Sequence, residues 1–247
     1  MRNNLIILLI GLLFFQCQEV KKGEVEDAGV IEESIDFDTT NIVESNTNLP
    51  TPEVLIDSLK IAKSGEYKII LKQIRTPDSV YVEFELYKKE NLGWKHLQYF
   101  SIEKDGITSL DAEFIDFNND NYNDLTFKRG VAARGANELR SLFVFDKEKE
   151  KLIHITNSNN YPNLRYNAEL DCIDAWLIYG GSSTVFLKLE ADTLREFAGV
   201  SLLDTRDVYT LDRNGNKKML SQDVIKDSVV YRRYSNYNPL KVNEEYE

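Results

Sequence analysis

The order of apolar and polar residues divides the chain into three stretches. An apolar run extends from Leu5 to Phe15, and an acidic, polar stretch from Gln18 to Pro50 has Phe37 as its single aromatic residue. Beyond Thr51, short segments alternate apolar and polar residues with a period of two, which is typical of half-buried β-strands. We therefore expect residues 51–247 to form a single β-rich domain.

Eleven short segments carry the strand pattern, and turns rich in Asn, Asp and Gly separate them. The expected strands cover residues 67–72, 80–87, 94–102, 125–127, 141–145, 151–156, 171–179, 184–189, 193–200, 207–211 and 229–234. Residues 53–62 are expected to form a short helix or an irregular entry segment. Many short strands at near-regular spacing predict an all-β fold, a small β-propeller-like domain of antiparallel strands, with a β-sandwich as the alternative.

The apolar run at the N-terminus is too short to be a permanent membrane span. As a helix, residues 5–15 would extend over about 16 Å, against the ~30 Å of a hydrocarbon core. The run follows Arg2 and precedes Cys17, which is the order of a signal peptide covering residues 1–16. An apolar run that ends in a cysteine resembles the lipobox of bacterial lipoproteins, in which the cysteine sulfur receives a diacylglycerol. This resemblance implies lipidation of Cys17.

Residues 17–50 are expected to form an acidic, flexible tether between the lipid and the domain. Between Gln18 and Pro50 there are nine Asp or Glu residues and two Lys, a net charge of −7. Such a composition buries too little apolar surface to offset the entropy of ordering. By resemblance, Gln18 in place of an Asp after the cysteine indicates the outer membrane, with the domain facing the periplasm or the cell surface.

The segment from Asp116 to Leu125 carries the most specific chemical pattern. Side-chain oxygens recur at positions 1, 3, 5 and 9, and the Tyr122 carbonyl stands at position 7, which is the spacing of a calcium loop. The expected ligands are Asp116, Asn118, Asp120, Tyr122 and Asp124. A hard cation requires several oxygens at once, and a tight loop turns every second residue toward the ion.

Two positions distinguish this loop from an EF-hand. Position 12 is Phe127 in place of the bidentate Glu, and position 6 is Asn121 in place of Gly. With one carboxylate fewer, the expected dissociation constant is about 10⁻⁴–10⁻³ M. The alternative is an Asn/Asp-rich turn that side-chain-to-backbone hydrogen bonds close without a metal.

The loop, the Gly- and Asn-containing segment after it and the aromatic strand Leu142–Phe145 resemble the calcium loop of FG-GAP/VCBS-type proteins. The order of segments from Phe114 to Leu220 is similar to that of periplasmic lipoproteins whose domain is a small calcium-bearing β-propeller. Some of these are immunity proteins that inhibit lysozyme-like effectors of bacterial-killing type IV secretion systems. The resemblance implies a structural Ca²⁺ and a muramidase-like partner.

The net charge of −11 and the pI of about 4.9 argue against nucleic acid as a partner, because phosphate binding needs a basic surface. The same charge favours divalent cations or a basic protein. Cys172 lies in an apolar stretch and is expected to be a buried, unreactive thiol. His96 and His154 lie inside strand patterns, which indicates structural positions, and we nominate no catalytic residue.

Three further segments are candidates for surface loops. The glycine-rich segment 130–137 lacks the Lys-Ser/Thr pair of a phosphate-binding loop and is expected to be a mobile loop. Residues 179–184 are expected to form a hairpin turn. Residues 231–238 mix aromatic and cationic side chains, which is typical of protein and glycan contacts or of a charged edge strand.

Three functions are compatible with these patterns. The first is a non-catalytic envelope binding protein, an inhibitor or immunity factor against a cell-wall hydrolase. The second is an envelope glycan-active enzyme, for which the chain shows no recognisable nucleophile or base. The third is a structural or adhesive lipoprotein that calcium stabilises.

The position of Cys17 leads to a direct test of the anchor. Substitution Cys17→Ser is expected to release the chain from membranes or to block its maturation, because stable anchoring requires more than one acyl chain on the protein. Metabolic labelling with a palmitate analogue measures this. A label that persists in the Cys17→Ser chain, or its absence from the unmodified chain, contradicts lipidation.

Overall fold

The computed structural model describes residues 52–105, 108–225 and 231–246. The described residues belong to one compact unit, Thr47–Glu247. They form antiparallel sheets and two short 3₁₀ turns, with no α-helix, so the predicted all-β class is confirmed. No helix among them has the length and apolar character needed to cross a membrane. The expected signal peptide, Cys17 and the tether lie outside the described residues.

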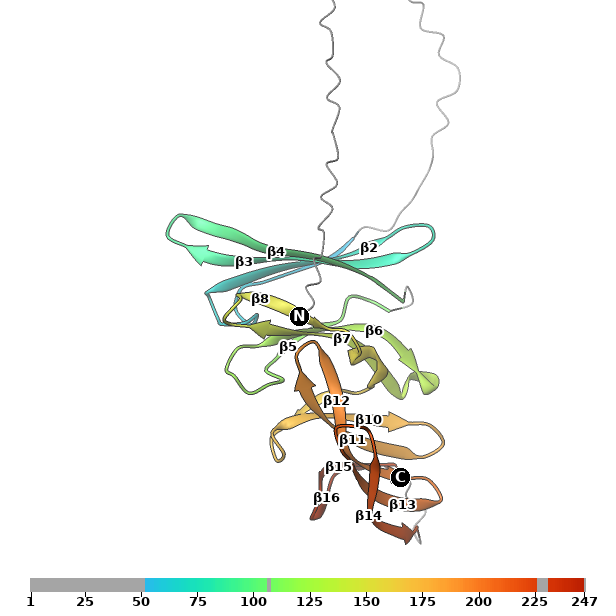
Figure 1. The fold of residues 1–247 in the computed structure, drawn as a ribbon. Coiled ribbons are helices and arrows are strands. Elements are labelled where there is room, and N and C mark those ends of the chain that lie inside the picture. Colours follow the sequence, from blue (N-terminus) through green and yellow to red (C-terminus); the bar gives the residue numbers. More distant parts are fainter. Residues whose placement is uncertain (1–51, 106–107, 226–230, 247) are drawn as a thin grey trace, which may run out of the picture. The chain divides into compact units, whose positions relative to one another are not determined.

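Within the described residues, sixteen strands make four sheets, and each sheet follows the order of the chain (Figure 1). The first sheet contains β1 (Glu53–Asp57), β2 (Tyr67–Arg75), β3 (Val80–Glu90) and β4 (Gly93–Lys104). The second contains β5 (Ala112–Ile115), β6 (Asp124–Ala132), β7 (Asn137–Asp146) and β8 (Lys151–Ile155). The third contains β9 (Arg165–Asn167), β10 (Cys172–Ile178), β11 (Ser182–Glu190), β12 (Thr193–Leu202), β13 (Thr205–Leu211) and β14 (Lys217–Val224). The last is the hairpin of β15 (Tyr231–Tyr237) and β16 (Leu240–Tyr246).

Three apolar clusters pack each sheet against the next. The first cluster joins side chains of the first and second sheets, among them Phe84 and Phe143. The second joins the opposite face of the second sheet to the third, for example through Leu142 and Ile173. The third joins the third sheet to β15, where Tyr234 is buried. The second sheet and strands β10–β12 of the third sheet are therefore covered on both faces.

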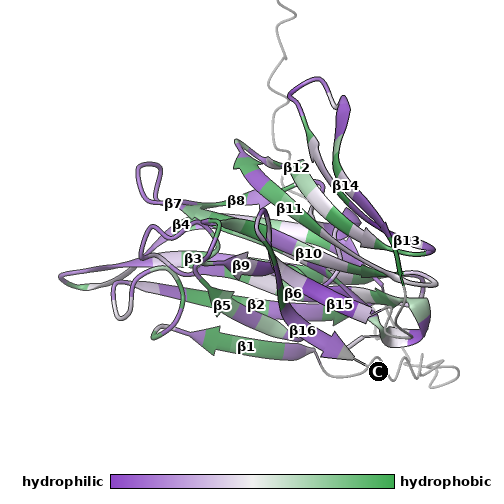
Figure 2. Ribbon diagram, turned by 90° about the horizontal axis from the view of Figure 1, so that it is seen from below, coloured by the Kyte–Doolittle hydropathy of each residue, from purple (hydrophilic) through white to green (hydrophobic). Residues whose placement is uncertain are grey.

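This arrangement explains the two hydrophobic patterns of the strands. In β2 and β3 every second side chain is buried, because one face of the first sheet packs on the core and the other faces solvent (Figure 2). The middle of β7, Ser141–Phe145, is buried at every position because it lies between two cores. A consecutive four-stranded meander is also the unit of a propeller blade, but the described strands close no barrel.

Of the two alternatives expected for residues 53–62, the short helix is wrong, because Glu53–Asp57 is strand β1, and an irregular segment covers only residues 58–62. Its Val-Leu-Ile centre pairs antiparallel with β2, with Leu55 opposite Leu71. The Asp57 carboxylate then accepts hydrogen bonds from the backbone N–H groups of Leu59, Lys60 and Ile61 and turns the chain. β-branched and apolar residues paired to a neighbouring strand outweigh the weak helical preference of this segment.

The segment 130–137 is a hairpin connection. Strand β6 continues to Ala132, a 3₁₀ turn covers Ala133–Gly135, and β7 begins at Asn137. Ala133 and Arg134 both adopt left-handed backbone conformations in this tight turn. The expected long glycine-rich loop is therefore reduced to a few residues at the end of a two-stranded ribbon.

Candidate functional site

The predicted calcium loop connects β5 to β6, and the side chain of Asp116 organises it. One oxygen of its carboxylate accepts hydrogen bonds from the N–H groups of Asn118 and Asp120, both at 3.2 Å. The other accepts the N–H of Asn121 at 2.8 Å. Asn119 and Asn121 have positive φ angles, which asparagine tolerates better than most residues. The loop is thus closed around the first of its expected ligands.

Two other contacts hold the loop in place, one to the segment between β1 and β2 and one to strand β7. The backbone groups of Ala62 and Asn123 form a reciprocal pair of hydrogen bonds, at 3.0 and 2.8 Å. The Tyr122 ring stacks on Phe145, with ring centroids 5.5 Å apart. The Asp120 carboxylate accepts the N–H of Tyr122 at 2.9 Å. The side chain of Tyr122 therefore anchors the loop. Its backbone carbonyl is the group that the calcium-loop spacing predicts as a ligand.

Asp124 is fully buried at the start of β6. One of its oxygens accepts the N–H of Phe117 at 2.7 Å, and the other accepts the N–H of Phe145 at 2.8 Å. Burial raises the pKa of Asp124 to about 7, against the lowering effect of these hydrogen bonds, and the charges of Asp116 and Asp120 raise it further. The carboxylate clamps the loop to strand β7, and a nearby cation would stabilise its charged form.

The loop meets the requirements of a calcium site in part. The Asn118 side-chain oxygen is buried without a hydrogen-bond partner, so one expected ligand has its acceptor available. The carboxylate oxygens of Asp116 and Asp124 already accept backbone N–H groups but keep further lone pairs. Among the described residues, no three His, Cys, Asp or Glu side chains are gathered as metal ligands. A cation would have to draw the loop carboxylates together.

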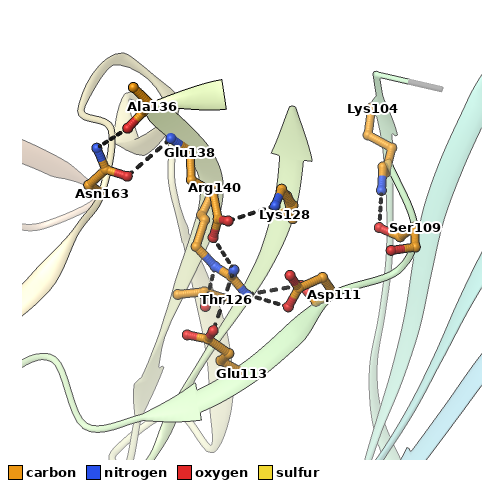
Figure 3. A network of polar contacts seen from close by, with 10 residues as sticks. All are labelled: Lys104, Ser109, Asp111, Glu113, Thr126, Lys128, Ala136, Glu138, Arg140 and Asn163. Atoms are coloured by element: carbon orange, nitrogen blue, oxygen red, sulfur yellow. Dashed lines mark hydrogen bonds and ion pairs between the residues drawn. The ribbon is translucent and has the colours of Figure 1, made fainter. Parts of the chain in front are cut away.

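A second polar cluster surrounds Arg140 on the face of the second sheet that meets the third (Figure 3). The Arg140 side chain is 5% exposed, and its Nε donates to the Thr126 hydroxyl at 3.0 Å. Its other nitrogens contact the carboxylates of Glu138, Asp111 and Glu113. One guanidinium thus connects β7 to β6, β5 and the segment before β5. Its N–H donors are engaged in these contacts, so its role is structural.

Asparagines join the second sheet to the third beside this cluster. The buried Asn137 side chain donates to the carbonyl of Ile178 and accepts its N–H, at 3.1 and 2.9 Å, as a paired strand would. Asn163 accepts the N–H of Glu138 and donates to the carbonyl of Trp176. These side chains substitute for backbone pairing between two sheets.

The remaining sequence candidates occupy structural positions. Cys172 is buried, and burial raises the pKa of its thiol to about 12, so it is held as the unreactive form. His154 stacks on Phe143 in the first core, and burial lowers its pKa. Within 231–238, Arg233 is buried against Asp174, and the Tyr234 ring lies in the third core. The cationic and aromatic residues of that segment hold the terminal hairpin to the third sheet.

The outer face of the first sheet carries exposed apolar and aromatic side chains that the strand pattern did not single out. Tyr99 is 55% exposed and Trp94 is 38% exposed. The Lys68 ammonium lies over the rings of both Tyr87 and Trp94, 4.6 and 4.9 Å from their centroids. The sequence did carry a signal for this face, namely the tyrosines, isoleucines and valines at the solvent-facing positions of β1–β4.

Comparisons with known proteins add little to this geometry. No protein-family model matches the chain, and no curated protein is significantly similar to it in sequence. One solved structure to which the chain is similar is described as the "Structure of a Xanthomonas Type IV Secretion System related protein". The two share 11% sequence identity and a TM-score of 0.43, over 70% of this chain and 100% of that chain. A likeness of this extent assigns no function to the chain.

The buried Lys104 leads to a prediction about pH. Its ammonium donates to the carbonyls of Thr108 and Ser109, at 3.1 and 2.8 Å, and burial lowers its pKa to about 8. In the unfolded chain the group stays protonated up to about pH 10.4. Between these two pKa values the unfolded state binds more protons than the folded state. The free energy of unfolding of the unmodified chain should therefore rise with pH, by about 2 kcal/mol between pH 7 and 9.5 relative to that of Lys104→Met.

Urea unfolding of both chains at a series of pH values measures this difference. Lys218→Met, on the exposed strand β14, is the matched control, and its difference from the unmodified chain should not change with pH. A pH-independent difference for Lys104→Met contradicts the lowered pKa.

Proposed function

We propose that the chain is a non-catalytic binding protein of the bacterial cell envelope, anchored by lipid on Cys17, that inhibits or gives immunity against a basic cell-wall hydrolase. The observation that carries the proposal is the outer face of the first sheet. Exposed apolar patches of this kind mark protein contacts, and tyrosine and tryptophan are the residues that such contacts favour.

The charge of the chain supports a basic partner. With 41 Asp and Glu against 30 Lys and Arg, the chain attracts cationic proteins from a distance and accelerates their encounter. On the outer face itself, acidic and basic side chains are interleaved, as in the pair of Lys72 with Glu85. Attraction therefore comes from the whole chain, while the aromatic side chains provide the contact.

In this proposal calcium is a structural ion held by Asp116, Asn118, Asp120, the Tyr122 carbonyl and Asp124. It would neutralise the carboxylates of the loop and keep the buried Asp124 charged, which strengthens the clamp on β7. The support is the ligand spacing together with the buried, unpartnered oxygen of Asn118. The ion would stiffen the second sheet and take no part in chemistry.

Thermal melting with and without calcium tests this role. Calcium at ten times its dissociation constant adds about 1.4 kcal/mol, which raises the melting temperature by about 3–6 °C over that in chelator. Asp120→Asn should reduce the rise, because it removes one negative charge from the loop while its amide oxygen can still accept the Tyr122 N–H.

Asp212→Asn is the matched control for the calcium experiment. The Asp212 carboxylate closes a similar turn by accepting the N–H groups of Asn214 and Asn216, but that turn has side-chain oxygens only at positions 1, 3 and 5 and Leu220 at position 9. Its variant should keep the full response to calcium. Identical melts of the unmodified chain in calcium and in chelator would show that the loop is an Asn/Asp turn without a metal.

Inhibition assays test the function. The full-length chain should slow peptidoglycan hydrolysis by at least one member of a panel of purified basic muramidases. Tyr99→Ala should weaken that inhibition by about ten-fold or more, as for a tyrosine at the centre of an interface. Tyr179→Ala, which changes an equally exposed tyrosine at the turn before β11, is the control. Hydrolysis rates that stay unchanged across the panel count against the proposal.

A further inference from the structure

A groove of about 420 Å³ lies between strands β1 and β5, at neighbouring edges of the first and second sheets. Leu55–Asp57 and Lys60 line one side, and Ala112–Ile115 line the other. Leu55, Ala112 and Phe114 also contact the first core. The groove is therefore a surface extension of the core, open to solvent and bordered by two strands.

Both bordering strands end their sheets. Strand β1 pairs only with β2, and β5 pairs only with β6, within the described residues. The outer side of an edge strand presents backbone N–H and C=O groups that another extended chain can pair with. Natural edges are commonly protected by charge, proline or a bulge, and the centre of β1 has none of these.

The apolar side chains at this edge are unusually exposed. Val54 is 54% exposed and Ile56 is 65% exposed; Leu59, two residues after β1, is 71% exposed, and Ile115 across the groove is 40% exposed. Figure 2 shows β1 as mostly hydrophobic along its length. These large apolar side chains lie around an edge of β1 that pairs with no strand among the described residues. An added strand could place its own side chains between them.

Carboxylates outnumber cations in the groove and limit what can occupy it. Asp57 and Glu113 line it together with Lys60. Strand β1 reads Glu-Val-Leu-Ile-Asp, with an apolar centre and an acid at each end, and Glu53, outside the lining, is paired with Arg75. A second copy of β1, paired antiparallel about Leu55, would set Glu53 opposite Asp57 of the other copy, and opposed like charges are unfavourable. A strand with an apolar centre and basic ends has the complementary pattern.

We propose that an extended segment of a partner protein, apolar in its centre and carrying Lys or Arg at its ends, adds a strand to β1 in this groove. The inference deepens the proposed function, on which it rests, by naming the surface and the mode of binding. Main-chain hydrogen bonds to β1 provide affinity that is independent of sequence. Val54, Ile56 and the carboxylates of Asp57 and Glu113 select the side chains.

A synthetic peptide tests the groove without a hydrolase. The probe is a fluorescent Lys-Val-Thr-Val-Lys peptide with blocked ends, titrated into the full-length chain in detergent and followed by anisotropy. Saturable binding is expected, and N-methylation of alternate peptide nitrogens should weaken it about ten-fold or more, because it removes the pairing donors. Hydrogen exchange should slow at the amides of Glu53–Asp57.

Matched variants locate the binding. Val54→Lys and Ile56→Lys should each weaken peptide binding about ten-fold or more, since they place a cation against a basic strand. Val224→Lys changes an exposed valine on edge strand β14, 74% exposed against 54% for Val54, and should leave binding unchanged. The changed residues are exposed, and circular dichroism confirms that each variant is folded.

Several results overturn the inference. These are the absence of saturable binding at millimolar peptide, equal binding of the N-methylated peptide, and equal binding to Val54→Lys. The two proposals fail separately. If a muramidase is inhibited equally by the unmodified chain and by Val54→Lys, strand addition at β1 is rejected while the proposed inhibitory function stands. If the peptide binds as described but no muramidase is inhibited, the proposed inhibitory function is rejected while strand addition in the groove stands.

Discussion

The second sheet is buried on both faces, and the rest of the structure depends on this constraint. A strand between two cores cannot alternate apolar and polar residues, so β7 presents Phe143 to one core and Leu142 to the other. Every polar group in such a sheet needs a partner inside the protein, because water does not reach it. The Arg140 cluster and the two asparagines that join neighbouring sheets supply those partners.

Asp124 shows how far this constraint extends. The carboxylate lies at the start of β6, where the second sheet meets its loop, and two backbone N–H groups hold it in place. Burial opposes its charge, and two more carboxylates of the same loop oppose it as well. A residue that the chain needs for geometry is therefore electrostatically unfavourable unless a proton or a cation compensates. The same position can serve as a clamp and as a ligand.

The sequence predicted the parts of the fold that local patterns determine. Alternation located β2 and β3, and turn residues located the hairpins, since both signals are short-range. Strand β14 escaped prediction because its residues are exposed on both faces, and a strand without a buried face has no alternation. Strand β1 was misjudged because its conformation is determined by pairing with β2, and its five residues carry no clear alternation of their own.

For the candidate site, the spacing of oxygens located the loop and its central side chains. It could not show that both oxygens of Asp124 bind backbone groups, because Phe145 lies twenty-one residues further along the chain. Nor could it show the exposed face of the first sheet, since a tyrosine at a solvent-facing position reads like any other polar strand residue. Both properties arise only when separate strands are brought together.

The meander order of the sheets has a consequence for how the chain is made and how it changes. Because every strand pairs with its neighbour in sequence, pairing involves short loops and small losses of chain entropy. A chain that emerges from a translocation pore in the extended state can therefore build its sheets in the order in which they appear. Stacked units that contact only their neighbours also tolerate the gain or loss of a whole unit, as repeat proteins do. Such an architecture can gain or lose one sheet at a time without a change in the strand connections of the other sheets.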